Sequence, residues 1–124
     1  MTSDLKNLKC KACEGGVDPL SIDDATVFLK QTSSWEINAD VMEISRTYTF
    51  ANFYETMAFV NVAAMVAHQQ DHHPDMTVGY NTCHIEYSTH SIGGLSENDF
   101  ICAAKTDKAL TLWLLCLLFF NMAK

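Results

Sequence analysis

All five histidines of this chain fall between positions 68 and 90. An imidazole has an ordinary pKa of about 6.5, so it can donate or accept a proton near neutral pH. His72 and His73 stand directly before Pro74, where a helix is expected to end, so their side chains point in different directions and at least one should face a cleft. We therefore predict an acid/base site in which His72, His73 and His90 transfer protons without a metal.

The pattern after Pro74 separates the remaining histidines. Apolar residues alternate with polar ones over 83–87, which predicts a strand with His84 on its polar face. His90 joins that face if the strand continues. We interpret His84 as a solvent-facing residue and place His90 in the pocket, beside Gly93 and Gly94, because glycines let a ligand approach the backbone closely.

A metal site is the alternative that the same residues leave open. His68 and His72 are four positions apart, a spacing typical of zinc ligands on a helix, and Asp71, His73 or Asp75 could complete the set. The residue after the first histidine is glutamine, however, and not the glutamate of helical metalloproteases. This difference favours the metal-free interpretation.

The cysteines give a second, weaker metal pattern. Cys10 and Cys13 form a CxxC motif, but structural zinc usually needs a second ligand pair, and Cys83, Cys102 and Cys116 occur singly. Five cysteines, an odd number, indicate a reducing compartment. The N-terminus lacks the apolar stretch of a secretory signal, so a cytoplasmic location is expected, with a nuclear one also compatible.

The elements that must position these groups alternate in a regular order. We expect a helix over 22–31, strands over 35–37 and 42–50, a helix from 53 that ends before Pro74, strands over 76–80 and 83–87, and a helix from 96. The apolar stripe of the second helix is predicted at Phe53, Met57, Val60, Ala64 and Ala67 or His68. This α-β-β-α-β-β-α order predicts an α+β fold, a four-stranded antiparallel sheet with helices packed on one face.

Length and charge restrict the architecture and the partners. The chain has 124 residues and a formal charge of -7, which fits one domain and argues against direct nucleic-acid binding. We divide it into an inert N-terminal arm (1–18), an α+β domain (19–108) and an apolar helical extension (109–124). The extension falls short of the about 20 apolar residues that span a bilayer, so burial within an oligomer is favoured over attachment to a membrane surface.

The histidine pattern resembles that of the pterin-4a-carbinolamine dehydratase family. The matching positions are His68, His72-His73-Pro74, Tyr80, His90 and Asp99. The resemblance extends from about Cys10 to Asp107. Many relatives carry Glu at position 68, and the apolar end of this chain also departs from the family.

This resemblance implies a hydro-lyase. Its substrate would be the 4a-hydroxytetrahydropterin released by aromatic amino acid hydroxylases, and its product the quinonoid dihydropterin of tetrahydrobiopterin recycling, with no cofactor. His72 and His90 become the acid/base candidates, His73 binds the substrate and can share the proton transfer, and Asp99 orients an imidazole. The candidates for binding or orienting the substrate are His68, Asp71, Pro74, Asp75, Ser88, Thr89 and Asp99.

The resemblance also implies partners. Family members form homodimers and homotetramers, and animal relatives act in addition as dimerisation cofactors for a homeodomain transcription factor. A coactivator that binds partner helices is therefore the alternative function. Only the enzymatic role requires the histidines.

Overall fold

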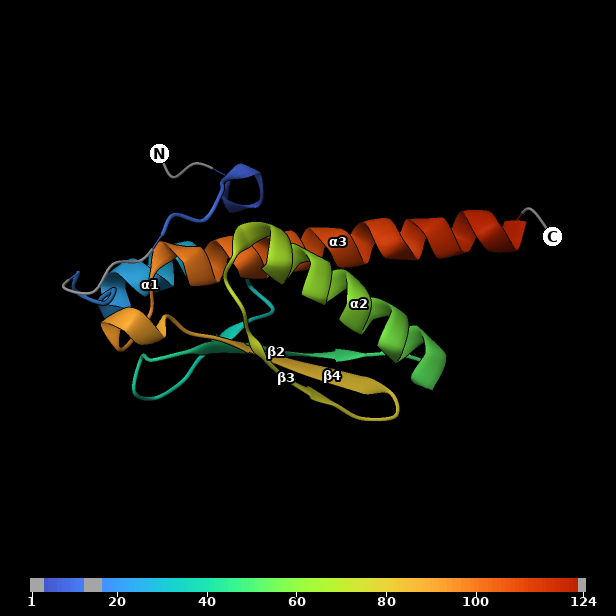
Figure 1. Ribbon diagram of the computed structural model, residues 1–124, viewed down its shortest axis with the longest axis horizontal. Helices are drawn as coiled ribbons and strands as arrows, with labels where there is room; N and C mark the ends of the chain where they lie inside the picture. Colours follow the sequence, from blue (N-terminus) through green and yellow to red (C-terminus); the bar gives the residue numbers. More distant parts are fainter. Residues whose placement is uncertain (1–3, 13–16, 123–124) are drawn as a thin grey trace.

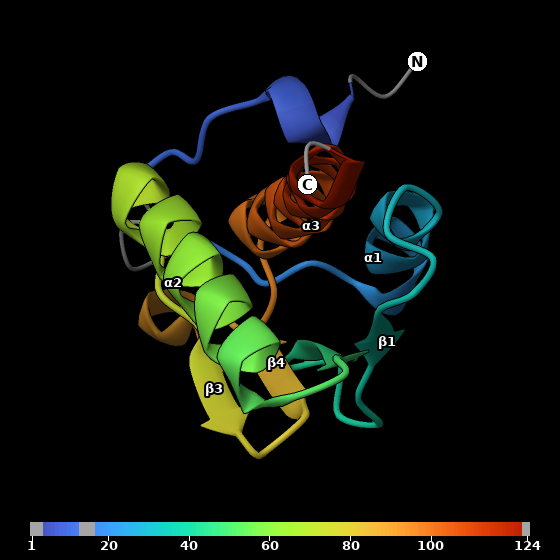
Figure 2. The same ribbon diagram turned by 90° about the vertical axis from the view of Figure 1, so that its right-hand side faces the viewer.

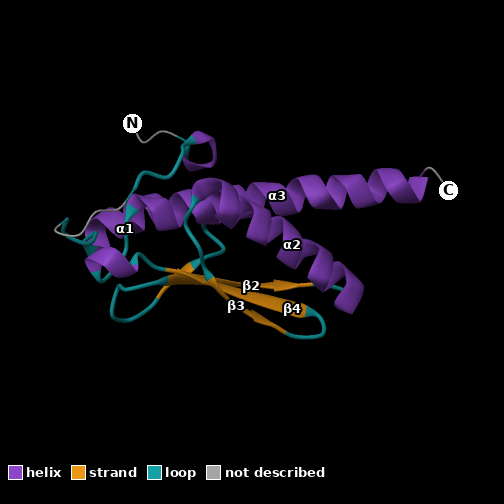
Figure 3. Ribbon diagram, in the orientation of Figure 1, coloured by secondary structure: helices purple, strands orange, loops and turns teal. Residues whose placement is uncertain are grey.

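The computed structural model describes residues 4–12 and 17–122. Its elements are η1 (Leu5–Asn7), α1 (Ile22–Leu29), β1 (Glu36–Ile37), β2 (Ile44–Thr49), α2 (Phe53–Gln70), β3 (Asp75–Val78), β4 (Thr82–Tyr87), η2 (His90–Ile92) and α3 (Glu97–Met122). Cys13 of the CxxC motif lies outside the described residues. The four strands form one antiparallel sheet in the order β1-β2-β4-β3, and the three α-helices cover one of its faces (Figures 1 and 3). The predicted α+β class is therefore confirmed.

The core lies between the sheet and the helices. Cys83, Ile85 and Tyr87 of β4 are fully buried, as their alternation predicts, and Ile44 and Tyr48 of β2 pair with Tyr87 and Cys83 across the ladder. Seen along the molecule, α3 lies between α1 and α2 above this sheet (Figure 2). The start of α3 is therefore held from two sides, which matters for the site below.

The opposite face of the sheet is polar. His84 donates to or accepts from Thr47 through Nδ1 at 2.7 Å, and its Nε2 lies 3.2 Å from Glu86. The His84 side chain is 37% exposed. The interpretation of His84 as a solvent-facing residue is thus confirmed.

Helix α2 is rotated relative to the predicted stripe. Its buried residues are Thr56, Phe59, Ala63, Val66 and Ala67, whereas Phe53 and Ala64 are exposed. The Thr56 hydroxyl donates to the carbonyl oxygens of Asn52 and Tyr80 at 2.8 and 3.0 Å. A polar residue can therefore face inward here. Apolar residues occur on nearly every side of this helix, so spacing alone could not select the buried one.

Some strand boundaries also differ from the prediction. The side chain of Asn38 accepts hydrogen bonds from the backbone of Met42 and Glu43 at 2.8 and 3.1 Å, which holds these residues in a loop, so β2 begins only at Ile44. At the second hairpin, the turn lies over 79–81 because Thr82 already belongs to β4. Strand β4 ends at Tyr87, as predicted, so it does not continue to His90.

Helix α3 runs without a break from Glu97 to Met122, and its last turns project beyond the sheet (Figure 1). Leu112, Leu114, Leu115 and Leu118 on this projecting part are exposed. In the described part of the chain, no helix is both long and apolar enough to cross a membrane. The four leucines therefore form an exposed apolar surface, whereas Trp113 in the same part of the helix packs edge-on against Phe50.

Asp107 ties α3 to the sheet. One carboxylate oxygen lies 2.6 Å from Arg46 Nη1 and accepts the Tyr48 hydroxyl, and the Trp35 indole N–H lies 3.1 Å from both oxygens. Burial, followed by the nearby charge of Asp107, raises the pKa of Tyr48, so its hydroxyl remains a donor. Two buried aromatic side chains thus depend on this one carboxylate.

Replacing Asp107 by alanine is expected to lower the free energy of unfolding by about 2 kcal/mol, because the buried donors of Trp35 and Tyr48 lose their acceptor. Urea unfolding monitored by tryptophan fluorescence would measure this loss. Lys108→Ala, at the exposed neighbouring position, serves as the matched control. A loss below about 0.5 kcal/mol would show that the contacts of Asp107 add nothing to stability beyond an ordinary surface change.

Candidate active site

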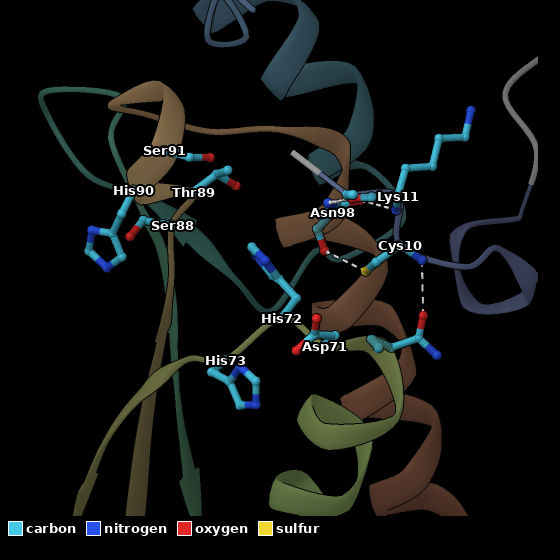
Figure 4. A pocket seen from close by; sticks show the side chains of 12 residues that line it. Cys10, Lys11, Asp71, His72, His73, Ser88, Thr89, His90, Ser91 and Asn98 are labelled. Atoms are coloured by element: carbon cyan, nitrogen blue, oxygen red, sulfur yellow. Dashed lines mark hydrogen bonds between the residues drawn. The ribbon is translucent and has the colours of Figure 1, made fainter. Parts of the chain in front are cut away.

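A cavity of about 530 Å³ opens where α2 ends, β4 ends and α3 begins (Figure 4). Its lining residues are Cys10, Lys11, Ala12, Gln70, Asp71, His72, His73, Ser88, Thr89, His90, Ser91 and Asn98. The three histidines predicted as catalytic therefore share one cavity. They come from two segments, the turn after α2 and the short helix η2.

The end of α2 places His72. Asp71 adopts the left-handed conformation with φ 50°, and the backbone N–H of His72 bonds the carbonyl of Ala67 at 3.1 Å. This cap turns the chain out of the helix, as Pro74 requires. The imidazole then stacks in parallel on the buried ring of Tyr87, with a centroid distance of 5.8 Å and an interplanar angle of 8°. His72 and His73 point in different directions (Figure 4).

A buried carboxylate fixes the far side of this imidazole. His72 Nε2 lies 2.6 Å from Asp99 Oδ1, and Asp99 has no exposed surface. The other oxygen, Oδ2, accepts the Thr89 hydroxyl and the backbone N–H of Ser96, both at 2.9 Å. Asp99 is the third residue of α3. It caps the helix by accepting the backbone N–H of Ser96, the residue that precedes α3. Both oxygens of the buried charge are thus hydrogen-bonded.

These contacts set the protonation of His72. Burial alone would lower the pKa of His72, but the hydrogen bond and charge of Asp99, helped by Cys10 and Asp71, outweigh it, and the pKa is raised. Because Nε2 is taken by Asp99, Nδ1 is the nitrogen left to exchange a proton with a ligand. His72 is therefore suited to give a proton at neutral pH.

His90 lies on the other side of the cavity and is exposed (Figure 4). The sequence pattern placed His90 near the end of a strand, whereas in the structure His90 is the first residue of η2. The chain turns there because the Thr89 N–H bonds the Gly94 carbonyl at 2.9 Å and Gly93 closes the turn with φ 69°. At position 94, a Cβ would lie 2.7 Å from Pro19 Cβ, so this close approach needs a glycine.

Four candidate residues do not line the cavity. Asp99 is buried and bonded to His72. His68 is exposed on the last turn of α2, Pro74 follows the histidine pair, and Asp75 lies opposite Glu86 on β3. His68 and His72 do not share a helix, since α2 ends at Gln70. Within residues 4–12 and 17–122, no group of three or more His, Cys, Asp or Glu side chains is placed to hold a metal ion. The helical metal pair therefore has no geometric support.

Comparison with known proteins adds the family. The family model for pterin 4 alpha carbinolamine dehydratase matches residues 18–109. The chain belongs to this dehydratase family. It is an enzyme family of the lyase class, and the predicted resemblance is confirmed.

Individual members agree with this assignment. A Nitrosomonas eutropha protein, named for the same dehydratase, is 60% identical over 108 residues, which cover 86% of this chain and 94% of that protein. A similarly named Legionella pneumophila protein is 50% identical over 111 residues, covering 89% and 98%. Among solved structures, a transcriptional coactivator/pterin dehydratase from Brucella melitensis has a TM-score of 0.70 at 27% identity, covering 74% of this chain and 98% of that one.

The cavity includes residues that sequence reasoning missed, above all those of the arm. Cys10 N–H donates to Gln70 Oε1 at 2.9 Å, and Lys11 exchanges two backbone bonds with the Asn98 side chain at 3.0 and 2.6 Å. Leu5 is fully buried against α3. The expectation of an inert arm was therefore wrong for these residues. The only signal for their role was that the family resemblance begins near Cys10.

Proposed function

We propose that this chain removes water from a 4a-hydroxytetrahydropterin to give the quinonoid dihydropterin, with His72 and His90 as the acid/base pair. The observation that carries this proposal is the pairing of His72 with buried Asp99 at a cavity that His90 also lines. Membership of the dehydratase family supports the reaction class. The product would re-enter tetrahydrobiopterin recycling.

The chemistry matches two imidazoles in different environments. The C4a–O bond breaks more easily when an acid protonates the hydroxyl group, which leaves as water, while N5 loses its hydrogen to a base as the C=N bond forms. We assign the acid to His72, since its pKa is raised, and the base to exposed His90. Atoms and electrons balance without an oxidant, so the step requires no redox cofactor. Each well-placed proton transfer contributes about 10² to 10⁴ in rate.

Other polar groups of the cavity are assigned to substrate binding. We propose that His73, Asp71 and Ser88 contact the pterin, because all three line the cavity. Thr89 and Asp99 act through His72, by holding the imidazole and its charge. His68, Pro74 and Asp75 lie outside the lining, so any effect on the substrate would be exerted through the turn that carries the histidine pair.

The proposal is tested by following the disappearance of a synthetic 4a-hydroxytetrahydropterin in a stopped-flow spectrophotometer. The full chain should accelerate dehydration above the buffer rate in a saturable manner. A tetrahydropterin without the 4a-hydroxyl should inhibit competitively. If the rate with protein equals the buffer rate across the substrate range, the enzymatic assignment fails.

We further propose that copies of this chain associate as a dimer or tetramer. Leu114 and Leu118 on α3 are 46% and 60% exposed, and an apolar surface of this kind is usually covered. Light scattering should give a mass of two or four chains, and Leu114→Glu with Leu118→Glu should reduce it. A monomeric wild-type protein at micromolar concentration would contradict this and would favour the coactivator alternative, in which partner helices cover the surface.

A further inference from the structure

Two thiols that are far apart in the sequence meet in the wall of the cavity. Cys10 Sγ lies 3.5 Å from Cys102 Sγ, a distance close to van der Waals contact. Cys10 belongs to the arm and lines the cavity (Figure 4), whereas Cys102 is in α3 and is fully buried. A reagent in the cavity therefore reaches Cys10 first and finds Cys102 directly behind it.

The arm holds Cys10 in this position. Its backbone N–H donates to the Gln70 side chain at 2.9 Å. The backbone N–H and carbonyl of the next residue, Lys11, are both hydrogen-bonded to the Asn98 side chain. A disulfide has an S–S distance of about 2.05 Å, so the two sulfur atoms would need to approach by about 1.5 Å. Hydrogen bonds and the packing of Cys10 on the core fix the arm here, and a segment outside any helix can adjust over such a distance more easily than a helix can.

The surroundings of the two thiols differ. A hydrogen bond from Cys102 lowers the pKa of Cys10, and the charges of His72 and Lys105 lower it further against the opposing effect of burial. The pKa of Cys102 is raised, by its hydrogen bond with Cys10 and by burial. Of the two thiols, ionisation is therefore favoured at accessible Cys10, and the thiolate is the nucleophilic form.

We propose that Cys10 is a modification site for hydroperoxides and that Cys102 resolves the oxidised form into a disulfide. In the first step, the Cys10 sulfur attacks the peroxide, an S–O bond forms, the O–O bond breaks and the alcohol or water leaves. In the second, the Cys102 sulfur attacks Cys10, the S–S bond forms and the S–O bond breaks with loss of water. In total, two thiols and one hydroperoxide give a disulfide, an alcohol (or water) and a further water.

This proposal does not depend on the reaction proposed above, because it concerns the thiols of the free protein. It makes a specific statement about pairing. Cys13 is close to Cys10 in the sequence, so a CxxC disulfide between these two is the competing product. Trypsin cuts after Lys11 and separates the peptides of Cys10 and Cys13, and a glutamate-specific protease cuts at Glu86 and Glu97, between Cys83 and Cys102.

The experiment treats the reduced full chain with hydrogen peroxide and maps the products by mass spectrometry after both digestions. We expect the loss of two free thiols, a link between the peptides of Cys10 and Cys102, and reversal by a phosphine reductant. In Cys102→Ala, Cys10 should instead accumulate as a sulfenic acid that a cyclic 1,3-diketone traps. A link from Cys10 to Cys13 would overturn the proposal.

Cys116 is the matched control, because it is exposed on α3 and, among the described residues, has no thiol partner. We expect Cys10 to be oxidised at least about tenfold faster than Cys116, as a thiolate-rich thiol should be. Equal rates at the two positions would also overturn the proposal. The wild-type map decides the pairing even if a cysteine variant does not fold.

Discussion

Replacing His72 by alanine is expected to lower the turnover number for carbinolamine dehydration by a factor of about 10² to 10⁴, the usual contribution of one proton transfer. The residue lines the cavity and is held by buried Asp99, so its loss removes a positioned acid. His90→Ala should cause a loss of similar size, through the base. Because the two groups act in one step, the double variant should lose less than the product of the single losses.

The measurement is kcat and KM from initial rates at one pH, with the buffer rate subtracted. His84→Ala is the control, since this histidine is on the far face of the sheet beside Thr47 and Glu86. It should retain the wild-type rate. If the double variant of His72 and His90 also kept the full rate, the histidines would not be the catalysts and the proposed mechanism would be wrong.

Replacing Asp99 by asparagine should have the second-largest effect on rate and should also change its pH dependence. The amide can still accept the bonds of Thr89 and Ser96, but its NH₂ group then faces His72 Nε2 and donates to it. Donation to Nε2 leaves the proton of the neutral imidazole on Nδ1, the other tautomer, and removes the negative charge. We expect a loss of about 10²-fold or more, as when the orienting carboxylate of another histidine site becomes an amide.

The direction of the pH effect follows from the raised pKa of His72. In the wild type, His72 stays protonated above its ordinary value of about 6.5, so the acid-dependent rate should fall only at higher pH. In Asp99→Asn, this fall should move to lower pH. Glu97→Gln, an exposed acid in the same helical turn, is the control and should leave the profile in place. An unchanged profile in Asp99→Asn would show that Asp99 does not set the protonation of the catalytic acid.

The free energy of unfolding should also depend on pH through the raised pKa of His72. A histidine whose pKa is raised by folding contributes stability that is fully present below its unfolded value of about 6.5 and is lost as the pH rises through the folded value. The wild type should therefore exceed Asp99→Asn in unfolding free energy most clearly below that pH. Urea unfolding at several pH values measures the difference, and a gap that grows with rising pH would contradict the ion pair.

Local signals predicted the parts of the site that depend on local structure. Pro74 ends the helix and so places His72 and His73, and the alternation in β4 separates His84 from the core. Both signals act within a few residues. They were sufficient for the α+β class and for the histidine pair.

Contacts between distant segments decided the rest. Cys10 meets Cys102 across 92 positions, and no local pattern encodes that contact. The short helix at His90 depends on Gly94 approaching Pro19, 75 positions earlier in the sequence. The buried side of α2 depends on Thr56 reaching Tyr80. In each case the local sequence is compatible with several arrangements, and tertiary packing selects one of them.

The position of Asp99 limits how this enzyme can be changed. Residues that serve only the reaction often cost stability, and their replacement then gives a slower but more robust protein. The Asp99 carboxylate serves both stability and the reaction, since it accepts the backbone N–H of Ser96 just before α3 and orients the imidazole. A mutant at this position loses rate and robustness together. We expect searches for thermostable variants to leave it untouched, so its retention in such variants would not by itself identify it as a catalytic residue.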